Sequence, residues 1–201
     1  MSIHAVFFDF GGVIQRTEFQ APRQHLGERF GMDYDDIDKL VFGSESARKA
    51  SVGEITEDAH WSNVLTRLKR PAAEMNAIKG EFFGGDVVDH TLVEFIRSLR
   101  GKFHVGLISN AWGGMRAHLE REKLIDLFDT VVISAEVQVM KPEAKIYSIA
   151  LEQAKVKAEE AVFVDDVQDN IDACQKVGMK GVLFNDPQKA MEELRKLLKI
   201  K

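Results

Sequence analysis

AVFVDDVQDN, residues 161–170, is the stretch that decides the fold. Its first part is apolar and rich in β-branched and aromatic residues up to Asp165, which is typical of a strand buried on both faces of a parallel sheet. Helical patterns separate it from similar runs, and one of these patterns places Leu92, Phe95, Ile96 and Leu99 on a single face. Strands that alternate with helices predict a three-layer α/β domain. The other runs after residue 88 are FHVGLIS (103–109), TVVIS (130–134) and GVLF (181–184).

The part of the chain before residue 88 has a different pattern. IHAVFFD (3–9) predicts one more strand. Residues 15–88 contain no strand pattern and predict four or five helices, one of them carrying its apolar residues at 61, 64, 65 and 68. We therefore expect a Rossmann-like parallel-sheet core formed by residues 1–14 and 89–201, with an all-helical cap inserted at 15–88. Open α/β sheets bind ligands beyond the carboxyl ends of their strands, so this architecture predicts a cleft beneath the cap.

Composition narrows the classes of function. The 201 residues include 27 basic and 32 acidic ones, for a net charge of -5, without the basic excess of a nucleic-acid binder. No apolar run approaches the roughly 20 residues that span a bilayer, and the N-terminus lacks a signal peptide's basic segment. The single cysteine, Cys174, excludes an intramolecular disulfide and a multi-cysteine zinc site. We expect a cytoplasmic protein, a monomer or weak dimer, with no nucleic-acid or membrane partner.

Polar residues stand at the ends of the first two predicted strands. Asp9 ends the first strand and suits a nucleophile, a metal ligand or a turn-forming residue. Gly11 and Gly12 follow it and allow a sharp turn in any of these cases. Ser109 and Asn110 end the second strand, before a helix expected to start near Trp112. Their polar groups suit an anion site at that helix N-terminus, although capping of the helix explains them equally well.

The next two strand ends carry charged residues. Pro142 suits the first turn of a helix, so Lys141 just before it is either a point charge for a phosphate or a solvated lysine. Asp165 and Asp166 form an adjacent pair whose repulsion raises one pKa unless a cation intervenes. Mg²⁺ prefers such oxygen ligands, and alternation along the strand means that one of the pair faces the ion directly. The alternative is a helix N-terminus decorated with acids.

Taken together, these four strand ends describe a phosphoryl-transfer site. In this interpretation Asp9 attacks phosphorus, while Ser109 and Lys141 hold the phosphoryl oxygens. Mg²⁺ neutralises the charge between Asp9 and the acidic pair. The cap covers the site and sets its specificity.

Four ordered motifs carry a resemblance to a known family, and they are FDFGGV (8–13), LISN (107–110), KPEAKIY (141–147) and FVDDVQDN (163–170). The chain resembles the haloacid dehalogenase-like (HAD) hydrolase superfamily, in the branch with a helical cap between the first and second motifs. The resemblance covers essentially the whole chain. It implies a nucleophile that forms an aspartyl-phosphate, a phosphate-binding group and a Mg²⁺ site.

The motifs assign these roles residue by residue. The resemblance implies that Asp9 and Lys141 are catalytic, with Asp9 as the nucleophile. It implies that Ser109, Asn110 and Lys141 bind the phosphoryl group. The implied metal ligands are Asp9, the backbone carbonyl of Gly11, Asp165 and Asp166, with Asp166 as the principal ligand. Asn170 stands where many members carry a second acidic residue.

One position departs from the family pattern. The family's phosphatases usually have a second aspartate, a general acid–base, where this chain has Gly11. Such a loss costs about 10²–10⁴-fold in rate, and less for aryl or acyl phosphates than for alkyl phosphates. The sequence predicts a Mg²⁺-dependent phosphatase for a small phosphorylated metabolite. The alternatives are a weakened member that binds a metabolite or a protein, and a 2-haloacid dehalogenase, which has no need of the pair Asp165 and Asp166.

Overall fold

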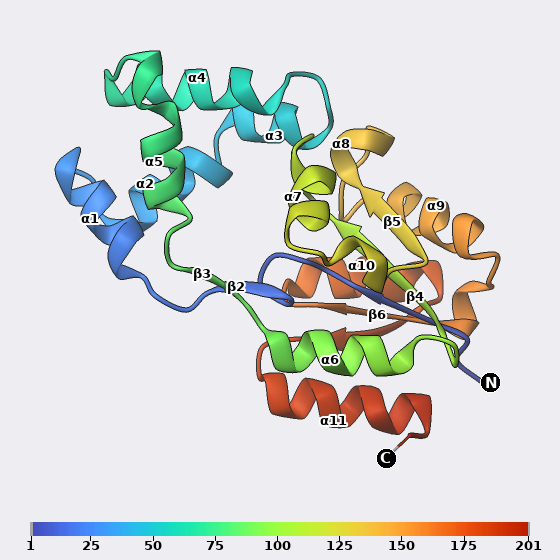
Figure 1. Cartoon of the computed structure of the whole chain (residues 1–201). Helices are drawn as coiled ribbons and strands as arrows, with labels where there is room; N and C mark the ends of the chain where they lie inside the picture. The colour runs from blue at the N-terminus through green and yellow to red at the C-terminus, as the bar shows by residue number, and fades with distance from the viewer. Residues whose placement is uncertain (1, 201) are drawn as a thin grey trace.

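Five parallel strands form the central sheet in the computed structural model, which describes residues 2–200 (Figure 1). The strand order is β5-β4-β1-β6-β7, so the chain builds the sheet outward from β1 first on one side and then on the other. Ala5 of β1 lies opposite His104 of β4 and Ala161 of β6. The predicted α/β fold and its five strands are confirmed. The strands are β1 (Ala5–Phe8), β4 (His104–Ser109), β5 (Thr130–Ile133), β6 (Ala161–Asp165) and β7 (Lys180–Leu183).

Helices cover both faces of this sheet (Figure 1). Val6 and Phe8 of β1 point into a hydrophobic cluster with helices α6 (His90–Leu99) and α11 (Pro187–Leu198). Ala5 and Phe7 point the other way, into a cluster with α9 (Ala144–Ala154) and α10 (Gln168–Val177). Because side chains alternate along a strand, a strand buried on both faces must be apolar at every position. This explains the continuous apolar runs of the sequence.

Five helices lie between residues 18 and 85, and we call them the cap. The predicted helices are present, and they pack around a hydrophobic cluster of their own that includes Leu26, Ile37, Trp61 and Phe82. The side chain of Thr56 caps the longest of these helices by accepting a hydrogen bond from the N–H of Ala59. The five helices are α1 (Ala21–Arg29), α2 (Tyr34–Phe42), α3 (Glu45–Ser51), α4 (Glu57–Leu68) and α5 (Met75–Phe82), with a 3₁₀ turn at Ala72–Glu74.

The prediction that residues 15–88 contain no strand is wrong. Strands β2 (Gln15–Thr17) and β3 (Asp86–Val88) pair in antiparallel fashion where the chain leaves the core and returns to it (Figure 1). The hydroxyl of Thr17 donates a hydrogen bond to Asp86 over 2.7 Å. Three-residue strands of mixed polarity are too short to produce a periodic hydrophobic pattern. The division of the chain into domains after residues 14 and 88 stays a prediction.

Two helices begin later than the sequence predicts. Gly113 and Gly114 extend the loop after β4, so α7 (Met115–Arg121) begins three residues beyond Trp112. Glu143 is the N-cap of α9, so Pro142 precedes that helix instead of standing in its first turn. The remaining short elements are α8 (Ser134–Val137) and 3₁₀ turns at Ile125–Leu127 and Ala158–Glu160. Within residues 2–200, no helix is long and apolar enough to cross a membrane.

Candidate active site

The predicted site residues converge at the carboxyl edge of the sheet. Asp9 directly follows β1, Ser109 ends β4 and Asp165 ends β6, and these three strands are neighbours. The Nζ atom of Lys141 lies 2.8 Å from Oδ1 of Asp9 and 2.7 Å from Oδ2 of Asp165. The Lys141 side chain is fully buried, so its charge is balanced only through these carboxylates. Lys141 is therefore not a solvated lysine, since it forms a buried ion triad with Asp9 and Asp165.

The carboxylate of Asp165 is held from several sides. Besides Lys141, its oxygens accept hydrogen bonds from the N–H of Val167 (2.8 Å) and from the side-chain amide of Asn170 (3.0 and 3.1 Å). Asn170 is in turn fixed by the hydroxyl of Tyr147, which donates to its carbonyl oxygen over 2.9 Å. An amide at position 170 supplies a donor to Asp165, which an acidic residue there could not do when ionised.

Asp166 points away from this network and toward the turn after β1. Gly12 has a φ of +75°, and a Cβ atom placed on it would lie 2.1 Å from Oδ2 of Asp166. Only glycine suits this position, because any side chain would be strained and would displace the carboxylate. Asp166 is also more exposed than Asp165. Asp165 is therefore buried within a hydrogen-bond network, whereas Asp166 is exposed beside the turn that follows β1.

Carboxylate oxygens of Asp9, Asp165 and Asp166 all lie within 4.8 Å of one another. Burial raises the pKa of Asp9 to about 7, against the lowering effect of Lys141 and with a further contribution from Asp165. Burial and the charge of Asp165 also raise the pKa of Asp166. Three carboxylates facing one Lys141 ammonium leave an excess of negative charge, and oxygen donors of this kind fit Mg²⁺. The residues present therefore fit the predicted metal.

Asn110 uses its side chain inside the protein. Its amide nitrogen donates to the carbonyl oxygen of Lys141 over 2.9 Å, and its amide oxygen accepts from the Lys141 N–H over 2.8 Å. A contact of Asn110 with phosphate would thus come from its backbone, and that role stays a prediction. The hydroxyl of Ser109 has no hydrogen-bond partner in the described part of the chain, which leaves it available to a ligand.

Two supporting residues were not identified from the sequence. The buried hydroxyl of Ser134, just after β5, accepts from the N–H of Ala111 (3.0 Å) and so fixes the loop that follows Ser109. Tyr147 supports Asn170 as described above. A polar residue at the end of the run TVVIS was the available signal for Ser134. The pairing of Tyr147 with a backbone carbonyl on another helix leaves no signal in the sequence.

Gly11 lies open beside the nucleophile. A Cβ atom placed on it would meet no other atom within 4 Å, and its φ does not lie in the left-handed region. Its backbone forms an isolated bridge with Gln15. The missing aspartate at this position is therefore not enforced by lack of room. Because glycine has no side chain, position 11 supplies no proton donor for a leaving group.

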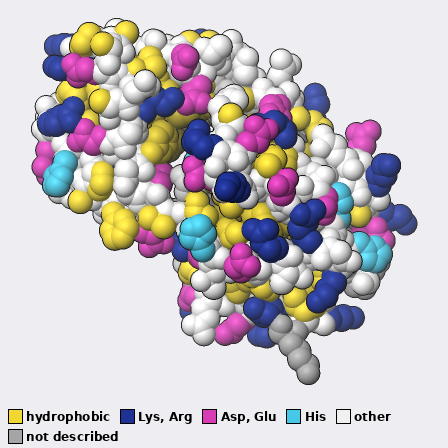
Figure 2. All heavy atoms as spheres, in the orientation of Figure 1, with side chains coloured by type: hydrophobic (Ala, Val, Ile, Leu, Met, Phe, Trp, Pro, Cys, Tyr) yellow, Lys and Arg dark blue, Asp and Glu magenta, His cyan; other side chains and the backbone are white. Residues whose placement is uncertain are grey.

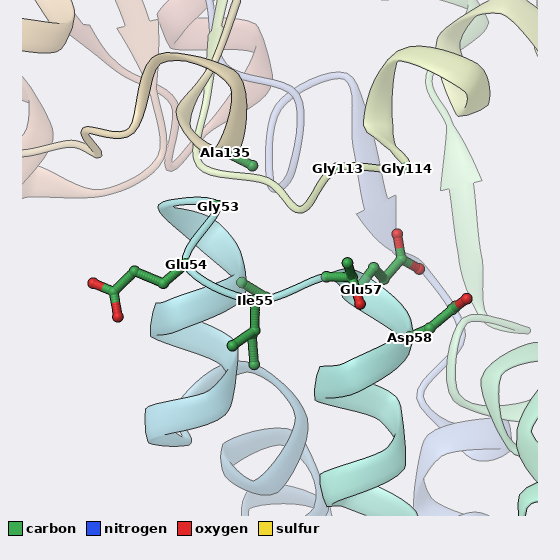
Figure 3. Close-up of a pocket in the computed structure, with 10 residues that line it drawn as sticks. Gly53, Glu54, Ile55, Glu57, Asp58, Gly113, Gly114 and Ala135 are labelled. Carbon is green, nitrogen blue, oxygen red and sulfur yellow. The ribbon is translucent and has the colours of Figure 1, made fainter.

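The cap meets the core beside these strand ends. A pocket opens between the α3–α4 turn and the loops of the core, lined among others by Gly53, Glu57, Gly114 and Ala135 (Figure 3). Glu57 points from the first turn of α4 toward Gly114, and it pairs with Lys79 over 2.6 Å. Gly53 lies so close to the carbonyl of Ala135 that a Cβ atom there would clash at 2.4 Å. The lining does not include the acidic cluster, so this pocket marks the cap–core contact and not the reaction centre.

The chain belongs to the haloacid dehalogenase-like hydrolase family, whose sequence model matches residues 6–184. This match spans all four motifs and the cap, and it confirms the family that the motifs indicate. The chain is therefore a hydrolase.

Among characterised proteins, the chain is similar to a sesquiterpene phosphatase, astK, of Aspergillus oryzae, with 27% identity over 96% of each chain. It is also similar to a phosphorylated carbohydrates phosphatase of Thermotoga maritima, with 26% identity over 90% of this chain and 84% of the relative. A HAD family enzyme from Bacteroides thetaiotaomicron, solved with magnesium and inorganic phosphate, shares the fold with a TM-score of 0.75. That structure is 19% identical and is aligned over 90% of this chain and 94% of its own.

Proposed function

We propose that the protein is a Mg²⁺-dependent phosphatase that hydrolyses a small phosphorylated metabolite through an aspartyl-phosphate on Asp9. The observation that carries this proposal is the buried contact of Lys141 with both Asp9 and Asp165, beside a third carboxylate at 166. Burying several charged groups together costs free energy, so such a cluster would not arise merely to stabilise a hydrophobic core. A phosphoryl group and a divalent cation account for it.

The two oxygens of Asp9 are not equivalent. Oδ1 accepts hydrogen bonds from the N–H of Phe10 (2.7 Å) and from Lys141 (2.8 Å), whereas Oδ2 has no donor among the described residues. We assign the attack on phosphorus to Oδ2. The Oδ2–P bond forms as the bond from phosphorus to the leaving oxygen breaks, and that oxygen takes a proton from water because Gly11 offers none. Water then attacks phosphorus, which releases inorganic phosphate and regenerates Asp9.

The remaining residues hold the phosphoryl group and the charges around it. The Ser109 hydroxyl and the backbone of Asn110 face the phosphoryl oxygens, and the Lys141 ammonium offsets the charge of the carboxylates. Asp9, Asp166 and the carbonyl of Gly11 are the groups we assign to Mg²⁺, since the Asp165 oxygens are already engaged. Mg²⁺ would supply charge neutralisation at the phosphoryl oxygens when bound.

Two of the similar proteins are phosphatases, which supports the reaction class. One is a sesquiterpene phosphatase and the other a phosphorylated carbohydrates phosphatase, so they support no single substrate. The structure solved with magnesium and inorganic phosphate supports the choice of cofactor.

The test is the Mg²⁺-dependent hydrolysis of p-nitrophenyl phosphate by the wild type and by Asp9→Asn. Its leaving group needs little protonation, so the assay examines the site without the missing acid at Gly11. We expect turnover that requires Mg²⁺ and is lost in Asp9→Asn, while the surface control Asp126→Asn keeps it. Equal rates in the wild type and in Asp9→Asn, with Mg²⁺ bound, would show that the protein is not a phosphatase of this kind.

The absence of an aspartate at position 11 favours a second candidate function. In this alternative the protein is a catalytically weakened family member that binds a phosphorylated metabolite or a protein without hydrolysing a phosphate ester. In that case phosphate binds in the presence of Mg²⁺ but p-nitrophenyl phosphate is not hydrolysed. A 2-haloacid dehalogenase would release halide from 2-haloacids without Mg²⁺, and it leaves Asp165 and Asp166 without a role.

A further inference from the structure

Phe42, the last residue of cap helix α2, has 48% of its surface exposed. The other large exposed hydrophobic residues within residues 2–200 are Phe19, Val87 and Val167. Figure 2 shows a hollow between the cap and the core with hydrophobic side chains on its wall. Contiguous exposed apolar surface on a monomer usually marks a binding site.

Phe42 is part of a continuous aromatic surface. Its ring stacks on Trp112 with the centroids 5.8 Å apart and the planes at 30°, and it meets Phe83 edge-on at 6.1 Å. Fully buried Trp61 lies behind, 6.0 Å from Phe83 and 6.1 Å from Trp112. We call Phe42, Phe83 and Trp112 the aromatic wall. Two of its members come from the cap, and Trp112 comes from the core.

The aromatic wall stands next to the predicted phosphate site. Trp112 follows Ser109 by three residues, so their Cα atoms are at most about 11 Å apart. Ala111, between them, is held by Ser134, which fixes this loop against the core. Val167, which directly follows Asp166, is a further exposed apolar residue, with 46% of its surface accessible.

The charges near the aromatic wall are already paired. Arg23 lies over the Phe42 ring at 5.6 Å, but its guanidinium is bound to Asp38 (2.6 Å) and Asp86 (3.2 Å). Two polar atoms behind the wall, the indole nitrogen of Trp61 and Nε2 of His60, have no hydrogen-bond partner in the described residues, but both are buried away from the surface. A sugar with several hydroxyl groups would find ring faces at the wall and few polar partners, and burying unpaired hydroxyls is costly.

We propose that the aromatic wall binds the leaving group of the substrate, and that the substrate is a phosphate monoester of an apolar alcohol. This inference rests on the proposed phosphatase function and names its substrate class. Open Gly11 points independently to an aryl ester within that class, because an aryl oxide departs without the proton that an aspartate would have supplied. The reaction is the hydrolysis proposed for Asp9, and the apolar alcohol is the product released from the phosphoryl group.

Binding of n-alkylphosphonates tests the inference without requiring turnover. We would measure their dissociation constants by calorimetry, with Mg²⁺ present, for chains of about four to ten carbons kept below micelle formation. Burial of each CH₂ group against the aromatic wall should tighten binding by up to about fourfold. In Trp112→Gln and in Phe42→Ser this dependence on chain length should become nearly flat. Phe42 is half-exposed, so its variant is expected to fold even where Trp112→Gln does not.

The matched control is Phe30→Ser, which removes a phenylalanine from the edge of the same cap cluster without touching the aromatic wall. This variant should keep the chain-length dependence of the wild type. Constant affinity along the series, or an equal dependence in the wild type and both wall variants, would overturn the inference. So would a higher kcat/KM for hexose phosphates than for naphthyl phosphate. Failure of all phosphate turnover with chain-length-dependent binding intact would instead overturn only the phosphatase function.

Discussion

Asn110 and Lys141 are 31 residues apart in the chain, yet the side-chain amide of Asn110 makes both possible hydrogen bonds to the backbone of Lys141. The amide thereby joins the loop that follows Ser109 to the segment that carries the buried ammonium. The position of Nζ between Asp9 and Asp165 depends on where that segment lies. Asn110 is therefore a positioning residue for Lys141 in this structure.

Asn110→Ala should lower kcat by about 10–10²-fold for p-nitrophenyl phosphate and change KM little, because misplacement of a charged group by about 1 Å is this costly. Ser109→Ala should mainly raise KM and the inhibition constant of inorganic phosphate, since it removes the proposed contact with the phosphoryl group. The two variants are compared by steady-state kinetics. A raised KM with unchanged kcat in Asn110→Ala would mean that the side chain binds substrate.

Lys141→Met should destabilise the metal-free protein by about 3–5 kcal/mol, because the carboxylates of Asp9 and Asp165 then lie buried without their counter-charge. Urea unfolding measures this difference. Adding Asp165→Asn to the Lys141→Met variant should recover part of the loss, since one of the unpaired charges is removed. Lys145→Met, at an exposed position of α9, should change stability by less than about 0.5 kcal/mol.

The stability gained in Asp9→Asn should depend on pH. The pKa of Asp9 is about 7 in the folded protein and 3.8 as the ordinary value, so between these limits the folded state binds more protons and loses stability as pH rises. Asparagine mimics the protonated side chain and avoids this loss. In EDTA, the free energy of unfolding of Asp9→Asn relative to that of the wild type should therefore increase between pH 4 and pH 7.5. The increase should be at most about 4 kcal/mol. A gain that is the same at both pH values would show that the Asp9 carboxyl does not titrate in this range.

Gly11→Asp should raise the hydrolysis of alkyl phosphates by about 10²-fold or more, because the new carboxyl has room and supplies the missing proton donor. Hydrolysis of p-nitrophenyl phosphate should change much less, since its leaving group needs little help. Gly11→Asn controls for the added side chain without an acid. Gly12→Ala should be inactive or unstable, because its Cβ would clash with Asp166. Equal effects of Gly11→Asp and Gly11→Asn would mean that proton transfer does not limit the reaction.

Mg²⁺ should stabilise the wild type against thermal unfolding, by about 2.7 kcal/mol at a concentration 100 times its dissociation constant. Asp166→Asn should lose this effect while its metal-free stability changes little, because Asp166 stands outside the network around Asp165. Asp165→Asn should instead lower the metal-free stability, since Lys141 loses a counter-charge and one of the two acceptor oxygens becomes an amide donor. Thermal scans with and without Mg²⁺ separate the two aspartates.

The sheet and the cap helices could be predicted from the sequence because their hydrophobic periods are long and regular. The convergence of Asp9, Ser109, Lys141 and Asp165 also followed, since the carboxyl ends of parallel strands share one edge. The roles within this set were harder to predict. Asn110 looked like a ligand residue because its partner, the backbone of Lys141, is distant in the chain and carries no side-chain signal.

The split between Asp165 and Asp166 is visible only in three dimensions. Alternation along the strand predicted that one of them faces the metal, whereas the contacts that distinguish the two carboxylates are those of Asp165 with Lys141, Val167 and Asn170. The short pair of strands β2 and β3 was missed for a related reason, since each is stabilised by the other and neither has a pattern of its own.

Strands β2 and β3 also bring the two ends of the cap together. Thr17 lies opposite Asp86, so the chain leaves and re-enters the core at adjacent points. Residues 18–85 form an insert whose removal would require only a tight turn between the two strands. Replacing this insert with another would leave the strand order of the large sheet unchanged. Because Trp112 belongs to the core, such a replacement would change only part of the proposed aromatic wall.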